Sequence, residues 1–106
     1  MNLYTEACEI AKEALEQCEY DLDKAQDFIH DICESHEAAI YYYRGVEFCS
    51  QQDTSDGEAF LEDCGGIAQP GDTFGAIACR IAFATLYCAA LEQLHELAEE
   101  LEEAAQ

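Results

Sequence analysis

Residues 4–43 read YTEACEIAKEALEQCEYDLDKAQDFIHDICESHEAAIYYY, a stretch without glycine or proline. Its apolar residues recur at alternating spacings of four and three, which is the period of one face of an α-helix. The stretch is therefore predicted to be helical, with this apolar stripe facing the core. The stripe consists of Tyr4, Cys8, Ala11, Leu15, Cys18, Leu22, Ala25, Ile29, Ile32, His36, Ala39 and Tyr43.

The first part of this stretch is predicted to form two helices. Asp21 and Asp23 follow Tyr20 closely, and aspartate is a weak helix former that favours N-cap positions. We expect helices near residues 4–19 and 22–35, with one continuous helix as the alternative.

Three more helices are expected in the rest of the chain. The first should cover residues 36–52, and Gly45 is a place where it can kink because glycine costs about 1 kcal/mol in a helix interior. The second should cover residues 58–64, and the last is a long helix that starts near Asp72 or Thr73 and ends near Ala104. The inner side of the long helix should carry Phe74, Ile77, Ile81, Ala84, Cys88, Leu91, Leu94, Ala98 and Leu101.

These segments define the fold class. No alternating apolar and polar run typical of a strand is found. The prediction is an all-α protein, a single acidic helical domain over residues 1–106, built as a small antiparallel bundle of about four to five helices with a long C-terminal helix.

The charge of the chain is far from balanced. Its 24 acidic residues against 4 lysines and arginines give a net charge of −20, although a magnitude of roughly 2 to 8 is enough to keep a small domain soluble. Such a field repels nucleic acids and anionic membranes and attracts basic surfaces. We therefore expect a basic protein surface as the partner, with no direct nucleic-acid binding and no membrane anchor.

Many of these acids form a line opposite the apolar stripe. We predict that they bind the partner, with Tyr41 or Tyr42 as aromatic anchors, because Tyr41, Tyr42 and Tyr43 cannot all face inwards on one helix. The Glu-rich segment from Glu96 to Glu103 is the alternative surface. The predicted binding acids are Glu6, Glu9, Glu13, Glu16, Asp23, Asp27, Asp31 and Glu34.

The seven cysteines indicate a reducing environment. Their number is odd and they include no CxxC pair, so we interpret them as reduced thiols that pack as small apolar residues in a cytosolic protein. A thiolate nucleophile requires a positive environment, which the acidic chain does not provide. We predict no catalytic residues, and therefore no enzyme.

Two segments of the chain contain residues of the kinds that bind metal ions. His30, Cys33 and His36 follow helical spacing, but only two neighbours among them can reach one ion. A zinc site would therefore also need a carboxylate such as Glu34 or Glu37. The segment around Gly57 fails the EF-hand pattern, because Gln52 falls at the first ligand position. No metal and no cofactor is predicted.

Two blocks of sequence resemble small acidic proteins of phages and mobile elements. They are Ile40-Tyr41-Tyr42-Tyr43 and DGEAFLEDCGG, residues 56–66. Length and charge are also similar to those of phage-encoded anti-CRISPR proteins, in particular those directed against type I-E systems. The resemblance implies a stoichiometric inhibitor in the cytosol of the infected bacterium. It would bind a Cascade-type surveillance complex or the nuclease-helicase Cas3.

Two other functions stay open from the sequence. An anti-restriction DNA mimic would differ only in its target. A phage or host adaptor that binds a partner helix through apolar contacts would keep its partner at high salt. A monomer is expected because two acidic faces repel each other.

Overall fold

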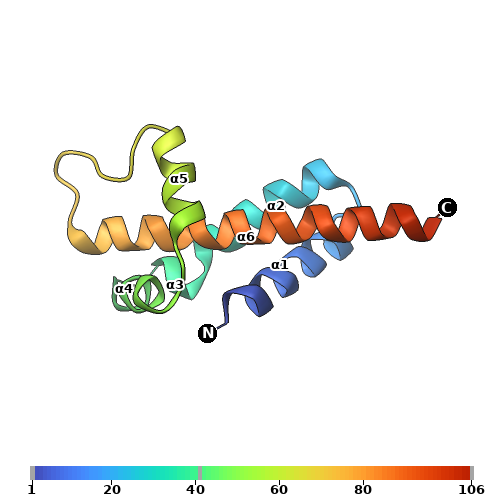
Figure 1. Ribbon diagram of the computed structural model, residues 1–106, viewed down its shortest axis with the longest axis horizontal. Helices are drawn as coiled ribbons and strands as arrows, with labels where there is room; N and C mark the ends of the chain where they lie inside the picture. Colours follow the sequence, from blue (N-terminus) through green and yellow to red (C-terminus); the bar gives the residue numbers. More distant parts are fainter. Residues whose placement is uncertain (1, 41, 106) are drawn as a thin grey trace.

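The computed structural model describes residues 2–40 and 42–105, and it confirms the all-α class for these residues. They form six helices and no strand (Figure 1). The helices are α1 (Leu3–Gln17), α2 (Leu22–Ser35), α3 (Glu37–Ile40), α4 (Tyr42–Gln51), α5 (Ser55–Asp63) and α6 (Phe74–Ala105).

The break between α1 and α2 lies where the sequence predicts it. Asp21 is the N-cap of α2, and its Oδ1 atom accepts hydrogen bonds from the backbone N–H groups of Asp23 and Lys24 at 3.1 and 3.2 Å. The preceding turn contains two residues with left-handed backbone, Glu19 at φ 53° and Tyr20 at φ 66°. The N–H of Tyr20 donates to the carbonyl of Leu15, which closes the end of α1. The two helices therefore form an antiparallel hairpin.

The expected helix over 36–52 is wrong in detail. The described residues form two helices here, α3 and α4, and Gly45 lies inside α4 rather than at the boundary between them. An added Cβ on Gly45 would lie 3.0 Å from Cys79 Sγ and 3.1 Å from Cys79 Cα. Glycine at this position therefore allows α4 to pack closely on α6.

The helix α5 begins at Ser55, three residues before the predicted start at Glu58. Gly57 lies in its first turn and touches α6, since an added Cβ would come within 2.6 Å of the Thr85 backbone nitrogen. A glycine that the sequence pattern assigns to a turn is thus a packing residue at a helix crossing.

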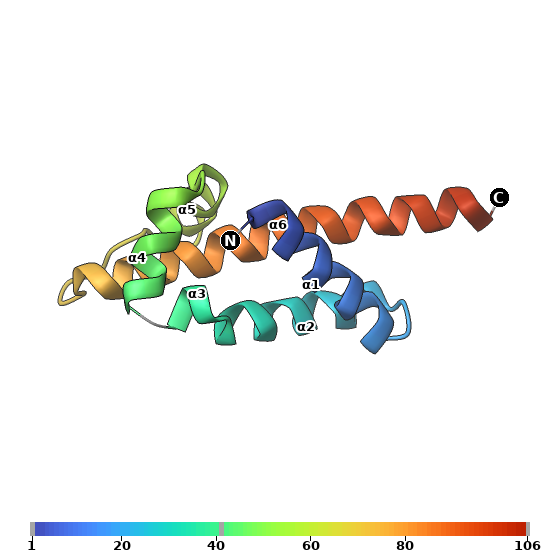
Figure 2. The ribbon, with the colours of Figure 1, turned by 90° about the horizontal axis from the view of Figure 1, so that it is seen from below.

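The core is organised around α6, which contacts all five other helices. Its 32 residues correspond to about 48 Å at about 1.5 Å per residue, close to the 51 Å length of the whole structure. The side of α6 that the other helices cover is rich in small residues, with Ala78, Ala82 and Ala90 among those buried. Small side chains let helix backbones approach closely. The helices α4 and α5 cross the N-terminal half of α6 (Figures 1 and 2).

By length and composition, α6 is also able to cross a membrane. Over Phe74–Ala104 its best window has a mean hydropathy of 1.7. The central helix of a small helical domain meets the same criterion, and 39% of that window is buried by the other helices.

Five residues of the predicted inner faces are exposed instead of buried. Each of the five lies in the first turn of its helix or near its end, where the surrounding helices cover the side chain less completely. The five are Tyr4 (67% exposed), Leu22 (39%), Tyr43 (70%), Phe74 (70%) and Leu101 (47%).

Candidate partner-binding surface

The predicted acids of α1 lie on its outer side. Glu9, Glu13 and Glu16 are exposed, and the helical period places them opposite the buried Ala7 and Ala11. Glu6 differs, because its carboxylate is 34% exposed and lies 3.5 Å from Nε2 of His36 at the end of α2. This pair joins the start of α1 to the end of α2.

The predicted acids of α2, Asp23, Asp27, Asp31 and Glu34, are all exposed. They lie on the side of the helix opposite the buried Ala25, which packs towards the core. Each helix of the hairpin therefore has its own acidic face. Because α1 and α2 are separate helices, the acids do not form one continuous straight line.

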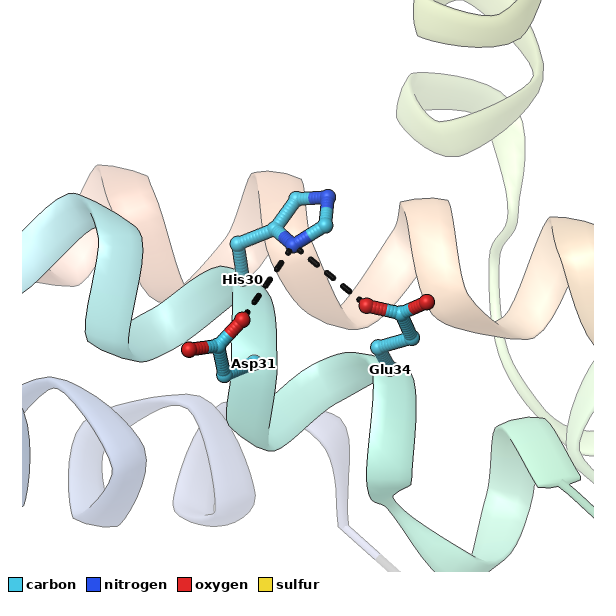
Figure 3. A group of neighbouring side chains, drawn as sticks. All are labelled: His30, Asp31 and Glu34. Carbon is cyan, nitrogen blue, oxygen red and sulfur yellow. Dashed lines mark ion pairs between the residues drawn. The ribbon is translucent and has the colours of Figure 1, made fainter.

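A histidine interrupts the acidic face of α2. The Nδ1 atom of His30 lies 3.9 Å from a carboxylate oxygen of Asp31 and 3.7 Å from one of Glu34 (Figure 3). Edge-on contacts with Phe83 and Tyr87 of α6, at centroid distances of 5.2 and 5.6 Å, orient the ring. All three side chains are exposed and their ligand atoms lie within 4.8 Å of one another, an arrangement that is common among exposed acidic groups without a bound ion.

The metal set considered from the sequence, His30, Cys33 and His36, is not brought together. Cys33 is fully buried, whereas the side chain of His30 is half exposed. Nδ1 of His36 accepts a hydrogen bond from the N–H of Ala38 at 3.1 Å, and its Nε2 faces Glu6. His36 thus caps a helix junction.

The interpretation of the cysteines as core residues holds fully only for Cys33. Burial raises the pKa of the Cys33 thiol to about 12, and burial is also the largest cause of the raised pKa values of Cys49, Cys79 and Cys88. Cys64 is exposed, which corrects the expectation for that residue.

The two arginines are engaged in ion pairs. Arg80 donates to the carboxylate of Asp72 at 2.8 Å, and this hydrogen bond holds the pKa of Asp72 below its ordinary value. Arg44 lies 3.2 Å from Glu37 and 3.6 Å from Glu47. Within residues 2–40 and 42–105 neither lysine lies within ion-pair distance of a carboxylate, so the acidic faces of the hairpin are neutralised only in part.

The sequence reasoning missed an acidic hollow beside the start of α1. A space of about 450 Å³ is bordered by Asp53 and Asp56 from the segment before and within α5, by Glu92 and Glu96 of α6, and by Tyr4. The Cys8 thiol is the largest cause that raises the pKa of the exposed Tyr4 hydroxyl, and the charges of two glutamates of α6 contribute. The spacing of Glu92 and Glu96 was the one signal available in the sequence. We name this set the Tyr4 hollow.

The predicted aromatic anchors cannot be placed. Tyr41 lies outside the described residues, and so does the side chain of Tyr42. Tyr43 is 70% exposed, and Tyr4 is exposed beside the acids of the Tyr4 hollow. The apolar stripe assigned both residues to the core.

Comparison of the chain with protein-family models, with curated proteins and with solved structures found no match.

Proposed function

We propose that the chain is a stoichiometric binding protein that occupies a basic, nucleic-acid-handling surface of another protein. The observation that carries this proposal is a set of acids on the outer sides of α1 and α2 that are exposed and lie in no ion pair among the described residues, while both arginines pair locally. These acids are Glu9, Glu13, Glu16, Asp23 and Asp27. An exposed, unpaired carboxylate gains most from meeting a basic group, because it has no internal partner to lose.

The charge density of the molecule supports competition with a nucleic acid. A net charge of −20 along a length of 51 Å corresponds to one negative charge per about 2.6 Å, against one per about 1.7 Å for duplex DNA. A groove that binds a duplex through lysine and arginine therefore meets a comparable field on this protein. The Tyr4 hollow adds an aromatic ring beside four carboxylates, a combination that suits an arginine side chain.

The resemblance to anti-CRISPR proteins selects the targets to try first. These are the Cascade-type surveillance complex of a type I-E system and the nuclease-helicase Cas3, both of which hold DNA on basic surfaces. The same surface would serve an anti-restriction DNA mimic with a different target.

The experiment is a pull-down with the immobilised chain from a lysate that contains a type I-E system, at about 0.1 M and about 0.5 M salt. The Debye length falls from about 10 Å to about 4 Å over this range, so contacts between exposed charges weaken strongly. We expect Cascade or Cas3 to be retained at low salt and released at high salt. Retention of neither at low salt would overturn the anti-CRISPR assignment, and retention of the same partner at both salts would favour the adaptor.

Two variants make the pull-down specific. Replacement of Glu9 and Glu13 by glutamine removes two exposed charges from α1 without a change in side-chain size. Replacement of Glu62 by glutamine and Asp63 by asparagine makes the same change in net charge at two exposed positions at the end of α5. If the hairpin faces bind the partner, only the first variant should lose it at intermediate salt. Equal losses would indicate that net charge alone is responsible.

A further inference from the structure

A second surface of the molecule is apolar rather than acidic. Tyr20, Leu22 and Leu101 are 60%, 39% and 47% exposed, and they come from the α1–α2 turn and the C-terminal end of α6. Leu15 lies at their base. Two hollows of about 440 and 370 Å³ share Leu15, Tyr20 and Leu101, one on each side of the turn. We call this surface the turn groove.

The shape of the backbone keeps the turn groove open. Tyr20 follows Glu19 in the left-handed region, where each non-glycine residue costs about 1 to 2 kcal/mol, and its ring is left largely in water. The C-terminal end of α6 extends past the α1–α2 turn (Figure 2), and Leu101 near this end is left half exposed. Exposed apolar side chains gathered at one place are typical of interaction sites.

The rim of the turn groove is acidic. Glu16, Glu99, Glu100 and Glu102 border the two hollows, against one lysine, Lys12. A partner segment that fits must therefore bring apolar side chains to the centre and positive charges to the edge. This pattern is that of a basic amphipathic helix.

We propose that the turn groove docks a basic amphipathic helix of a partner protein, alongside α1, α2 and α6. This inference rests on the proposed function, since it gives the basic partner a second and more specific point of contact. A helix is the fitting shape because residues 2–40 and 42–105 offer no strand edge to pair with an extended peptide. A second copy of the chain would bring two acidic rims together, and an anionic membrane surface would face the same rim.

The test uses two synthetic peptides of about 18 residues, or about five helical turns, made of leucine and lysine and labelled with fluorescein. In one peptide the leucines recur every three or four residues. In the other the same residues are scrambled so that no apolar face forms. Fluorescence anisotropy at about 0.15 M salt measures the affinity of the full chain for each peptide.

The variants are chosen to keep the fold. Tyr20→Gly removes the ring at a position whose left-handed backbone glycine adopts readily, and Leu101→Ser changes a half-exposed residue near the end of α6. Tyr43→Ser is the matched control, because Tyr43 is as exposed as Tyr20 but lies on α4. Circular dichroism checks that each variant stays helical.

We expect the wild type to bind the amphipathic peptide at least about tenfold tighter than the scrambled peptide. Tyr20→Gly and Leu101→Ser should each weaken binding of the amphipathic peptide by about tenfold, as substitutions at interface hot spots do. Tyr43→Ser should leave this affinity unchanged. Equal binding of both peptides, or no effect of Tyr20→Gly, would overturn the proposal that the turn groove docks a helix. Neither result would contradict the proposed function of the acidic faces of α1 and α2. Failure of both peptides to bind would overturn the groove as well, and the pull-down then tests the proposed function separately.

Two further outcomes would also overturn the proposal. A dimer in sedimentation experiments that Tyr20→Gly converts to a monomer would identify a second copy as the occupant. Binding to uncharged phosphatidylcholine vesicles that Tyr20→Gly abolishes would identify a lipid surface.

Discussion

The crossing of α5 over α6 predicts a large effect for Gly57→Ala. A Cβ at this position would lie 2.3 Å from Thr85 Oγ1, 2.6 Å from Thr85 N and 2.9 Å from Thr85 Cα, whereas carbon atoms in contact prefer about 3.5 to 4.0 Å. Thr85 cannot move aside easily, because it is 2% exposed and its hydroxyl donates to the carbonyl of Ile81 at 2.8 Å. The helix α5 must therefore move away from α6.

The magnitude follows from two opposing terms. Overpacking costs about 1 to 3 kcal/mol, and the upper end applies because two of the three close atoms belong to the backbone. Alanine returns up to about 1 kcal/mol through its better helix propensity. The net loss of about 2 kcal/mol should lower Tm by about 8 to 16 °C.

Thermal unfolding followed by circular dichroism at the helical band measures this change. Ala59→Gly at an exposed position of α5 is the control, because it measures helix propensity in the same helix without a clash. The wild type should melt highest, and Gly57→Ala should melt below Ala59→Gly. If Gly57→Ala melts at or above the wild type, the helices do not approach as closely as described.

Four smaller predictions follow from other contacts. Asp21→Ala removes the acceptor for two N–H groups of α2 and should lower the free energy of unfolding by about 1 kcal/mol, whereas Asp21→Asn should recover most of it in the same denaturant titration. The pKa of Asp72 is lowered in the folded state by Arg80, so its stabilising effect is present above the ordinary aspartate pKa and is lost as the pH falls through the folded value. Asp72→Asn should therefore be less stable than the wild type at neutral pH and equally stable in strong acid, and an equal difference at both pH values would contradict this origin. Cys33, whose pKa is raised to about 12 by burial, should react with Ellman's reagent only on unfolding, while the exposed Cys64 reacts at once, as serine variants of each would show. The net charge of −20 opposes compaction, so Tm should rise with sodium chloride up to about 0.5 M, and a flat response would show that self-repulsion is unimportant.

The helices that the sequence predicts well are those with long apolar periods and clear caps. Two predicted helix starts have such caps. Asp21 accepts a hydrogen bond from the N–H of Asp23 at the start of α2, and the hydroxyl of Thr73 accepts one from the N–H of Ala76 at the start of α6. The early start of α5 was missed, because Ser55, Asp56 and Gly57 are typical turn residues that also suit the first turn of a helix.

The candidate site was predicted only in part, for a reason of geometry. A helical period shows which residues share a face, and this placed the acids of α1 and α2 correctly on outer sides. It does not show where a neighbouring helix ends, so the exposure of Tyr4, Tyr43 and Leu101 could not be foreseen. The Tyr4 hollow and the turn groove each combine segments far apart in the chain, and their formation depends on tertiary packing.

The position of α6 in the chain has a consequence for biosynthesis. Because α6 contacts every other helix and follows them in the sequence, the other five helices are translated before the helix that holds them together. At about 5 to 20 residues per second, the 32 residues of α6 take roughly 2 to 6 s to translate. During that interval the apolar sides of α1 and α2 have no α6 to cover them, and the repulsion between nascent acidic chains on one polysome would help to keep them apart.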